Sequence, residues 1–116
     1  MKKITKISEY WLAVKNVLSG PDKWTKGTRK NTKGQMCVLG AMDEVQKTND
    51  ISCINIPIGI ETTRRALENN LIKAIYKKKN FYESISHYND RASTKYEDVI
   101  DVLKLAFHAA KKEETK

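Results

Sequence analysis

Apolar residues recur at steps of three or four along several segments of this chain, and this spacing constrains the fold more than any other feature. In residues 4–18 the recurring positions are Ile4, Ile7, Trp11, Val14 and Leu18. Such spacing places the apolar side chains on one face of a helix. We expect this helix to end at Gly20 and Pro21, because glycine tolerates a left-handed cap and proline cannot continue the hydrogen-bond ladder.

The same spacing predicts a second and a third helix. The second begins between Gly34 and Cys37 and ends by Asn49. Its expected buried residues are Val38, Ala41, Met42 and Val45. The third covers residues 61–79 and ends in three lysines, which favour the negative end of a helix dipole. Its expected inward residues are Leu67, Leu71, Ile72 and Ile75.

A last helix is predicted near the C-terminus. Thr94 and Glu97 have the spacing of a capping box, which marks a helix start. The expected inner face is Val99, Val102, Leu103, Ala106 and Ala110. The charged tail, residues 111–116, is expected to fray, and residues 81–91 favour neither helix nor strand.

Two segments lack a helical period. Residues 20–35 are rich in glycine, threonine and lysine and predict a long basic loop, of a length that is often functional. In residues 51–60 isoleucine alternates at every second position, with Pro57 and Gly59 between, which predicts a short extended edge segment. Residues 1–116 are therefore expected to form a mainly α, single-domain bundle of about four helices.

The charge balance indicates the kind of partner. There are 22 lysine and arginine residues against 14 aspartate and glutamate residues, a net charge of +8, which favours an anionic partner. The longest uncharged stretch, residues 51–60, is far shorter than the roughly 20 residues of a membrane span. No apolar run of the kind a secretory signal needs follows the N-terminal lysines. We therefore expect a cytoplasmic protein whose Cys37 and Cys53 are free thiols.

Two common chemistries are poorly matched. Gly34 and Gly40 have the spacing of a phosphate-binding loop, but no Lys-Ser or Lys-Thr pair follows. The possible zinc ligands are widely spaced single residues, namely Cys37, Cys53, His87 and His108. We expect no nucleotide triphosphatase, no cofactor and no metal.

The basic loop is the first candidate site. Its candidate residues for an anionic partner are Lys23, Trp24, Lys26, Arg29, Lys30 and Lys33. An indole among cations can stack on a base while the cations hold phosphate. The alternative is that Trp24 fills the edge of the core and the lysines only keep the loop soluble.

Cys37 is the second candidate. It lies at the expected start of a helix behind the basic loop, and both surroundings favour a thiolate. His87, Asn89 and Asp90 could supply the base and the orienting group of a cysteine nucleophile. The alternative is a buried structural cysteine, because Cys37 shares a core-facing stripe with Ala41.

Three short motifs resemble those of an uncharacterised family of small bacterial and phage proteins. They are Trp24 before a glycine-containing loop, the run Cys37-Val38-Leu39-Gly40-Ala41, and an Asn89-Asp90 turn before a Thr94-capped helix. The resemblance spans about residues 24 to 107 and implies a phage or mobile-element origin. It also implies that one pocket gathers Trp24, Cys37, Gly40, Asn89, Asp90 and Arg91.

Three functions remain open. The first is a non-enzymatic binding protein whose basic face captures nucleic acid, a nucleotide signal or an acidic host protein surface. By analogy with small, charged phage proteins, this binder could inhibit host defence. The second is a small enzyme with Cys37 as nucleophile. The third is a structural or assembly protein whose motifs serve only the fold.

Overall fold

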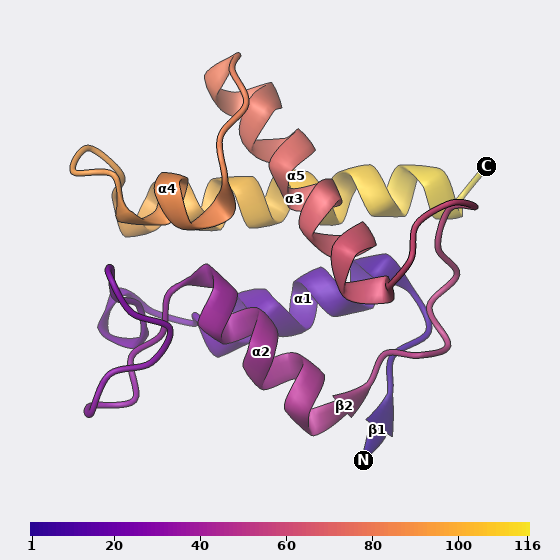
Figure 1. Cartoon of the computed structure of the whole chain (residues 1–116), viewed down its shortest axis with the longest axis horizontal. Coiled ribbons are helices and arrows are strands. Elements are labelled where there is room, and N and C mark those ends of the chain that lie inside the picture. The colour runs from indigo at the N-terminus through magenta and orange to yellow at the C-terminus, as the bar shows by residue number, and fades with distance from the viewer.

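The computed structural model describes all 116 residues, and five α-helices carry the fold (Figure 1). They are α1 (Ile7–Val17), α2 (Val38–Thr48), α3 (Thr63–Lys79), α4 (Ile85–Asp90) and α5 (Tyr96–Glu114). A 3-10 helix lies at Pro21–Lys23, and β1 (Lys2–Lys3) pairs in parallel with β2 (Asn49–Asp50). The prediction of a mainly α bundle is confirmed.

The helices form two crossed layers. α1 packs along α5, and in Figure 1 these two helices run in opposite directions behind α2 and α3. α2 packs on α1, α3 packs on α5, and the short α4 contacts both α2 and α3. α4 thus closes the end of the molecule where the long loop leaves α1 (Figure 1).

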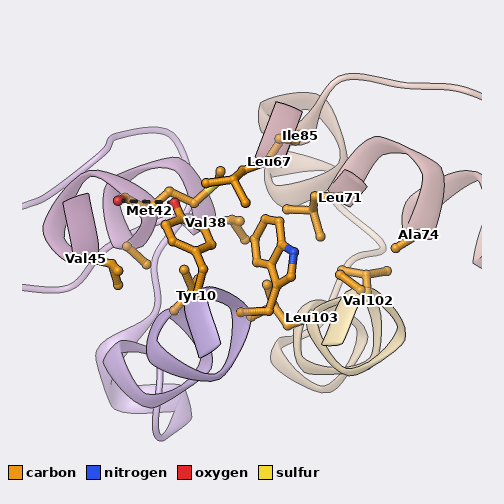
Figure 2. Close-up of a cluster of buried hydrophobic side chains, with 14 of the residues drawn as sticks. Tyr10, Val38, Met42, Val45, Leu67, Leu71, Ala74, Ile85, Val102 and Leu103 are labelled. Carbon is orange, nitrogen blue, oxygen red and sulfur yellow. Dashed lines mark hydrogen bonds between the residues drawn. The ribbon is translucent and has the colours of Figure 1, made fainter. Parts of the chain in front are cut away.

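The apolar faces predicted from the helical spacing meet in one core. Figure 2 shows side chains of α1, α2, α3, α4 and α5 converging, among them Tyr10, Met42, Leu71, Ile85 and Leu103. The largest fully buried side chains are Trp11, Tyr10 and Tyr88. Full burial of a large apolar side chain contributes about 1.5–3 kcal/mol, so these faces dominate the stability of the bundle.

The first helix is shorter than predicted because Ile4 serves a different element. The Ile4 amide donates to the Asp50 carbonyl at 2.9 Å, which extends the β1–β2 pairing, and the side chain is buried. The buried stripe of α1 therefore continues to Ile4 across the junction between strand and helix, although Ile4 itself is not helical.

The edge segment predicted at residues 51–60 is irregular and outside the sheet. Ile54 is buried, whereas Ile58 is fully exposed, so the alternating isoleucines do not share one buried face. Pro57 has no amide to donate, and Gly59 has a φ of 93°, which breaks an extended chain. The short strand lies just before this segment, at Asn49–Asp50.

The last helix begins and ends later than predicted. Thr94 is buried and does not cap it; Lys95 is the N-cap residue, and its amide donates to the Asp98 carboxylate at 2.9 Å. The tail is helical as far as Glu114. The Glu114 carboxylate accepts hydrogen bonds from the Ser8 amide at 3.1 Å and hydroxyl at 2.6 Å, so it caps the first turn of α1.

Candidate functional site

Asn89 on α4 joins the loop to the start of α2. Its Oδ1 accepts from the Trp24 indole Nε1 at 2.8 Å and from the Val38 amide at 3.1 Å. Its Nδ2 donates to the Thr25 carbonyl at 3.2 Å and to Asp90 Oδ1 at 2.8 Å. The side chain is fully buried, and these four bonds use its whole hydrogen-bonding capacity. We call these five residues the Asn89 cluster.

Further hydrogen bonds tie the following loop residues to α4. The Gly27 amide donates to Asp90 Oδ1 at 2.9 Å, and the Lys26 ammonium donates to the Arg91 carbonyl at 2.6 Å. Lys26 Nζ also lies 5.6 Å from the centre of the Trp24 ring. The ring itself packs against the hydrophobic core. The loop is therefore fixed at its first half, and the indole is engaged within the fold.

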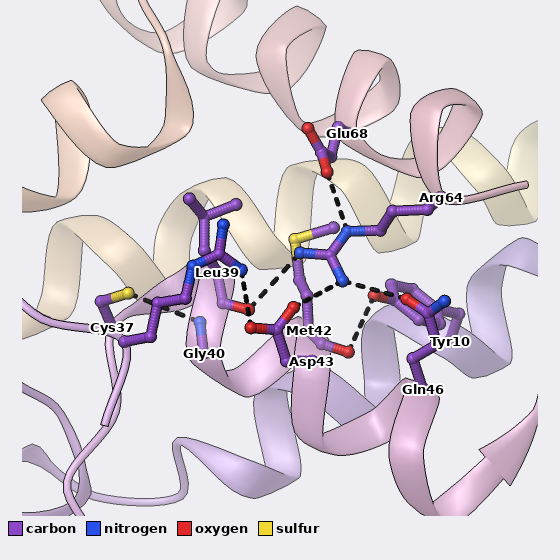
Figure 3. A network of polar contacts seen from close by, with 10 residues as sticks. Tyr10, Cys37, Leu39, Gly40, Met42, Asp43, Gln46, Arg64 and Glu68 are labelled. Atoms are coloured by element: carbon purple, nitrogen blue, oxygen red, sulfur yellow. Dashed lines mark hydrogen bonds and ion pairs between the residues drawn. The ribbon is translucent and has the colours of Figure 1, made fainter. Parts of the chain in front are cut away.

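The loop also crosses α2 at very close range. The Cys37 amide donates to the Arg29 carbonyl at 3.3 Å, and a Cβ on Gly40 would lie only 1.8 Å from the same carbonyl oxygen. Cys37 Sγ accepts from the Gly40 amide at 3.4 Å and so caps the helix (Figure 3). The sequence Cys-Val-Leu-Gly thus provides both a cap and room for the loop backbone.

An ion-pair network links the loop, α2 and α3 (Figure 3). Asp43 Oδ2 lies 2.6 Å from Arg29, and its Oδ1 lies 2.9 Å from Arg64, which also binds Glu68 at 2.8 Å. Partial burial raises the pKa of Asp43, but the hydrogen bonds from Arg29 and Arg64 outweigh it and hold that pKa below its ordinary value. Sequence reasoning missed this network because its charges lie 14 and 21 residues apart.

The residues proposed to assist Cys37 do not form a catalytic arrangement with it. Cys37 is 5% exposed, and no hydrogen bond joins its sulfur to His87, Asn89 or Asp90. The His87 side chain is 66% exposed and its Nδ1 lies 3.9 Å from the Glu83 carboxylate. Among these three residues, Asn89 binds beside Cys37: its side chain accepts a hydrogen bond from the amide of Val38, the residue that follows Cys37.

The six loop residues proposed for an anionic partner fall into two groups. Three already have partners: Trp24 donates to Asn89, Lys26 donates to the Arg91 carbonyl, and Arg29 pairs with Asp43. The other three are exposed and have no ion-pair partner, namely Lys23, Lys30 and Lys33. The structure thus leaves three lysines of the loop available to a partner.

The whole arrangement lies within one family match. A family model described as a family of unknown function (DUF6197) matches residues 5–109. The chain belongs to DUF6197. No curated protein and no solved structure is significantly similar to it. The match to DUF6197 includes the loop, the Asn89 cluster and the ion-pair network, and leaves out only the two ends of the chain.

This DUF6197 protein also has a half-buried ion pair beside the Asn89 cluster. The Glu83 side chain is 4% exposed, and its Oε2 lies 2.6 Å from Arg91 Nη2. The guanidinium lies 5.1 Å from the centre of the Phe81 ring. Glu83 Oε1 and Arg91 Nε are buried without partners. Sequence reasoning placed Arg91 in the motif pocket but missed Glu83, whose role depends on the turn between α3 and α4.

Two further features of this DUF6197 structure bear on metal binding and on membrane spanning. No three His, Cys, Asp or Glu side chains are grouped so that they could hold a metal ion. None of the helices has both the length and the apolar character of a membrane span.

Proposed function

We propose that this DUF6197 protein is a non-enzymatic binding protein that captures an anionic partner through the exposed lysines of loop 20–35. The observation that carries the proposal is the anchoring of the loop, by Asn89 and Asp90 in its first half and by hydrogen bonds of Gln35 to Asn31 and to the Asp22 carbonyl in its second half. A loop held in one conformation loses less entropy when a partner binds its lysines. The net charge of +8 adds long-range attraction for such a partner.

The partner classes are nucleic acid, a nucleotide signal and an acidic protein surface. The resemblance to small bacterial and phage proteins supports a phage or mobile-element origin, a cytoplasmic setting and a host-defence protein as the acidic target. Binding of this kind needs no cofactor, because lysine ammonium groups recognise phosphate or carboxylate directly.

A specific observation favours a second candidate, a structural or assembly protein. Trp24, Gly40 and Asn89 each satisfy a packing or hydrogen-bonding need of the fold. Motif residues with such roles stabilise the protein whatever it binds. The lysine experiment below separates the two candidates, whereas the cysteine enzyme gains no support from the surroundings of Cys37.

The test compares two triple variants with equal change in net charge. The loop variant is Lys23→Glu with Lys30→Glu and Lys33→Glu; the control variant is Lys47→Glu with Lys111→Glu and Lys112→Glu, all exposed residues elsewhere. Affinity is measured for a duplex DNA, a cyclic dinucleotide and a polyglutamate peptide, one probe for each partner class.

We expect at least one probe to bind the wild-type protein and the control variant alike and to lose about tenfold or more on the loop variant. If the probe is DNA, three lysine contacts predict a loss of about 40-fold between about 50 and about 200 mM salt. Equal affinity of the two triple variants for every probe would refute the proposal and leave the structural candidate.

A further inference from the structure

A second group of free cations lies on α3, away from the loop. Arg65, Lys73 and Lys77 are exposed, and none has an ion-pair partner. Their spacing of eight and four residues places them on one face of the helix. Two nearby carboxylates are committed elsewhere, Glu68 to Arg64 and Glu83 to Arg91.

Two tyrosines stack at the end of the same face. Asn80 ends α3 with a left-handed φ of 64°, and the chain then turns so that Tyr82 lies on Tyr76. The ring centres are 4.3 Å apart and the planes differ by 23°. Tyr82 is 68% exposed, which leaves an aromatic surface open to solvent.

A groove of about 300 Å³ lies beside Tyr82. Its polar lining comes from Asn69, Asn70 and Lys73, and its apolar lining includes Ile60 and Ala66. The side chains of Asn69 and Asn70 make no hydrogen bond within the chain. Their amides each offer a donor and an acceptor, which can pair with the edge of a base.

We propose that this face of α3 binds single-stranded nucleic acid. A base stacks on Tyr82 above the groove, the Asn69 and Asn70 amides meet its edge, and the cations hold the phosphates. Arg65 and Lys77 lie 12 residues apart, about 18 Å along a helix. This separation is longer than one nucleotide needs, so the site suits a strand of several nucleotides. A duplex hides its base faces and cannot use the tyrosine.

The site is independent of loop 20–35, and its test distinguishes the two. Fluorescence anisotropy measures binding of a labelled single-stranded oligonucleotide of about 12 nucleotides. The proteins are wild type, Tyr82→Ala, Tyr82→Phe, Lys73→Glu with Lys77→Glu, the loop triple variant and the control triple variant. A duplex of the same sequence and uridine monophosphate serve as competitors.

We expect Tyr82→Ala and the Lys73 and Lys77 double variant each to weaken binding by about tenfold. Tyr82→Phe should keep the affinity, because it keeps the ring. Because Tyr82 is exposed, its replacement should leave the fold intact, and unchanged melting temperatures of the variants would show this.

Equal affinity of wild type and Tyr82→Ala would overturn the proposal, as would preference for the duplex. Binding lost only in the loop variant would overturn it too, while supporting the loop function. Competition by uridine monophosphate at the affinity of the strand would show a mononucleotide site instead.

Discussion

A fully buried asparagine destabilises a fold unless both ends of its amide find partners, and Asn89 finds four. Those partners belong to the loop, to α2 and to α4 itself. The cluster therefore replaces apolar packing where the loop covers the end of the bundle. Its position could be suspected from the Asn89-Asp90 turn, but its partners could not, because Trp24 lies 65 residues away.

Replacing Asn89 by alanine tests how much this cluster contributes to the stability of the fold. The change leaves the Trp24 indole N–H and the Val38 amide without acceptors, each at a cost of about 1–3 kcal/mol. We expect Asn89→Ala to lower the free energy of unfolding by about 2–5 kcal/mol in urea denaturation. Asn16→Ala, at an exposed asparagine of α1, is the control and should change it by less than about 0.5 kcal/mol.

Replacing Gly40 by alanine gives a test in which the sign of the change in stability decides the outcome. Replacing glycine by alanine within a helix ordinarily stabilises it by about 1 kcal/mol. Here the new Cβ would lie 1.8 Å from the Arg29 carbonyl oxygen, so the loop backbone must move. We expect Gly40→Ala to lower the melting temperature, with a loss of about 1–3 kcal/mol. A stabilised variant would show that the loop does not cross α2 closely.

At the level of elements, the long helices were predictable and the short ones were not. About three to five turns repeat an apolar stripe often enough to be recognised, as in α1, α3 and α5. α4 has only six residues, and its helix depends on the Ser84 hydroxyl accepting from the His87 amide at 3.1 Å. The isoleucine alternation of residues 51–60 was misleading because tertiary contacts, and not the pattern, decide which isoleucines are buried.

The ion-pair network connects three elements, and its contribution to stability should be lost at acidic pH. Because the pKa of Asp43 is lower in the folded state, its ionised form stabilises the fold above the ordinary value of 3.8, and this is lost as pH falls through the folded-state pKa. Asp43→Asn should therefore be less stable than wild type at pH 7, and the difference should shrink below about pH 4. Urea denaturation across this range measures it; a constant difference would contradict the assignment.

The contact between α1 and α5 provides another test. Glu114 caps the first turn of α1 through Ser8, whereas Glu113 pairs with Lys116 at the exposed end of the chain. We expect Glu114→Ala to cost about 1 kcal/mol, as the loss of a helix cap does. Glu113→Ala, its neighbour, should have little effect on thermal unfolding. Equal effects would mean that the cap contributes nothing.

At the scale of the whole molecule, the reactivities of the two cysteines distinguish the native from the unfolded protein. Cys53 is exposed, while Cys37 is buried at the start of α2, where its amide binds the loop. Iodoacetamide should modify Cys53 quickly in the native protein and Cys37 only when the molecule unfolds. Mass spectrometry of the two peptides at rising urea concentrations measures both rates. Rapid native modification of Cys37 would contradict its burial and revive the cysteine-enzyme hypothesis.

The Ser8–Glu114 contact also determines how the molecule would respond to mechanical force. It joins residues 106 positions apart, next to the two ends of the chain. Because α1 begins and α5 ends at this contact, both helices extend from it toward the same side of the molecule (Figure 1). Tension between the termini would therefore load this contact as soon as the short β1–β2 pairing opens. The two helices would then separate one turn at a time, starting from that end. They would not slide past each other along their whole length. A pull from the termini should therefore meet low resistance, whereas a pull between Ser8 and the middle of α5 would shear the core.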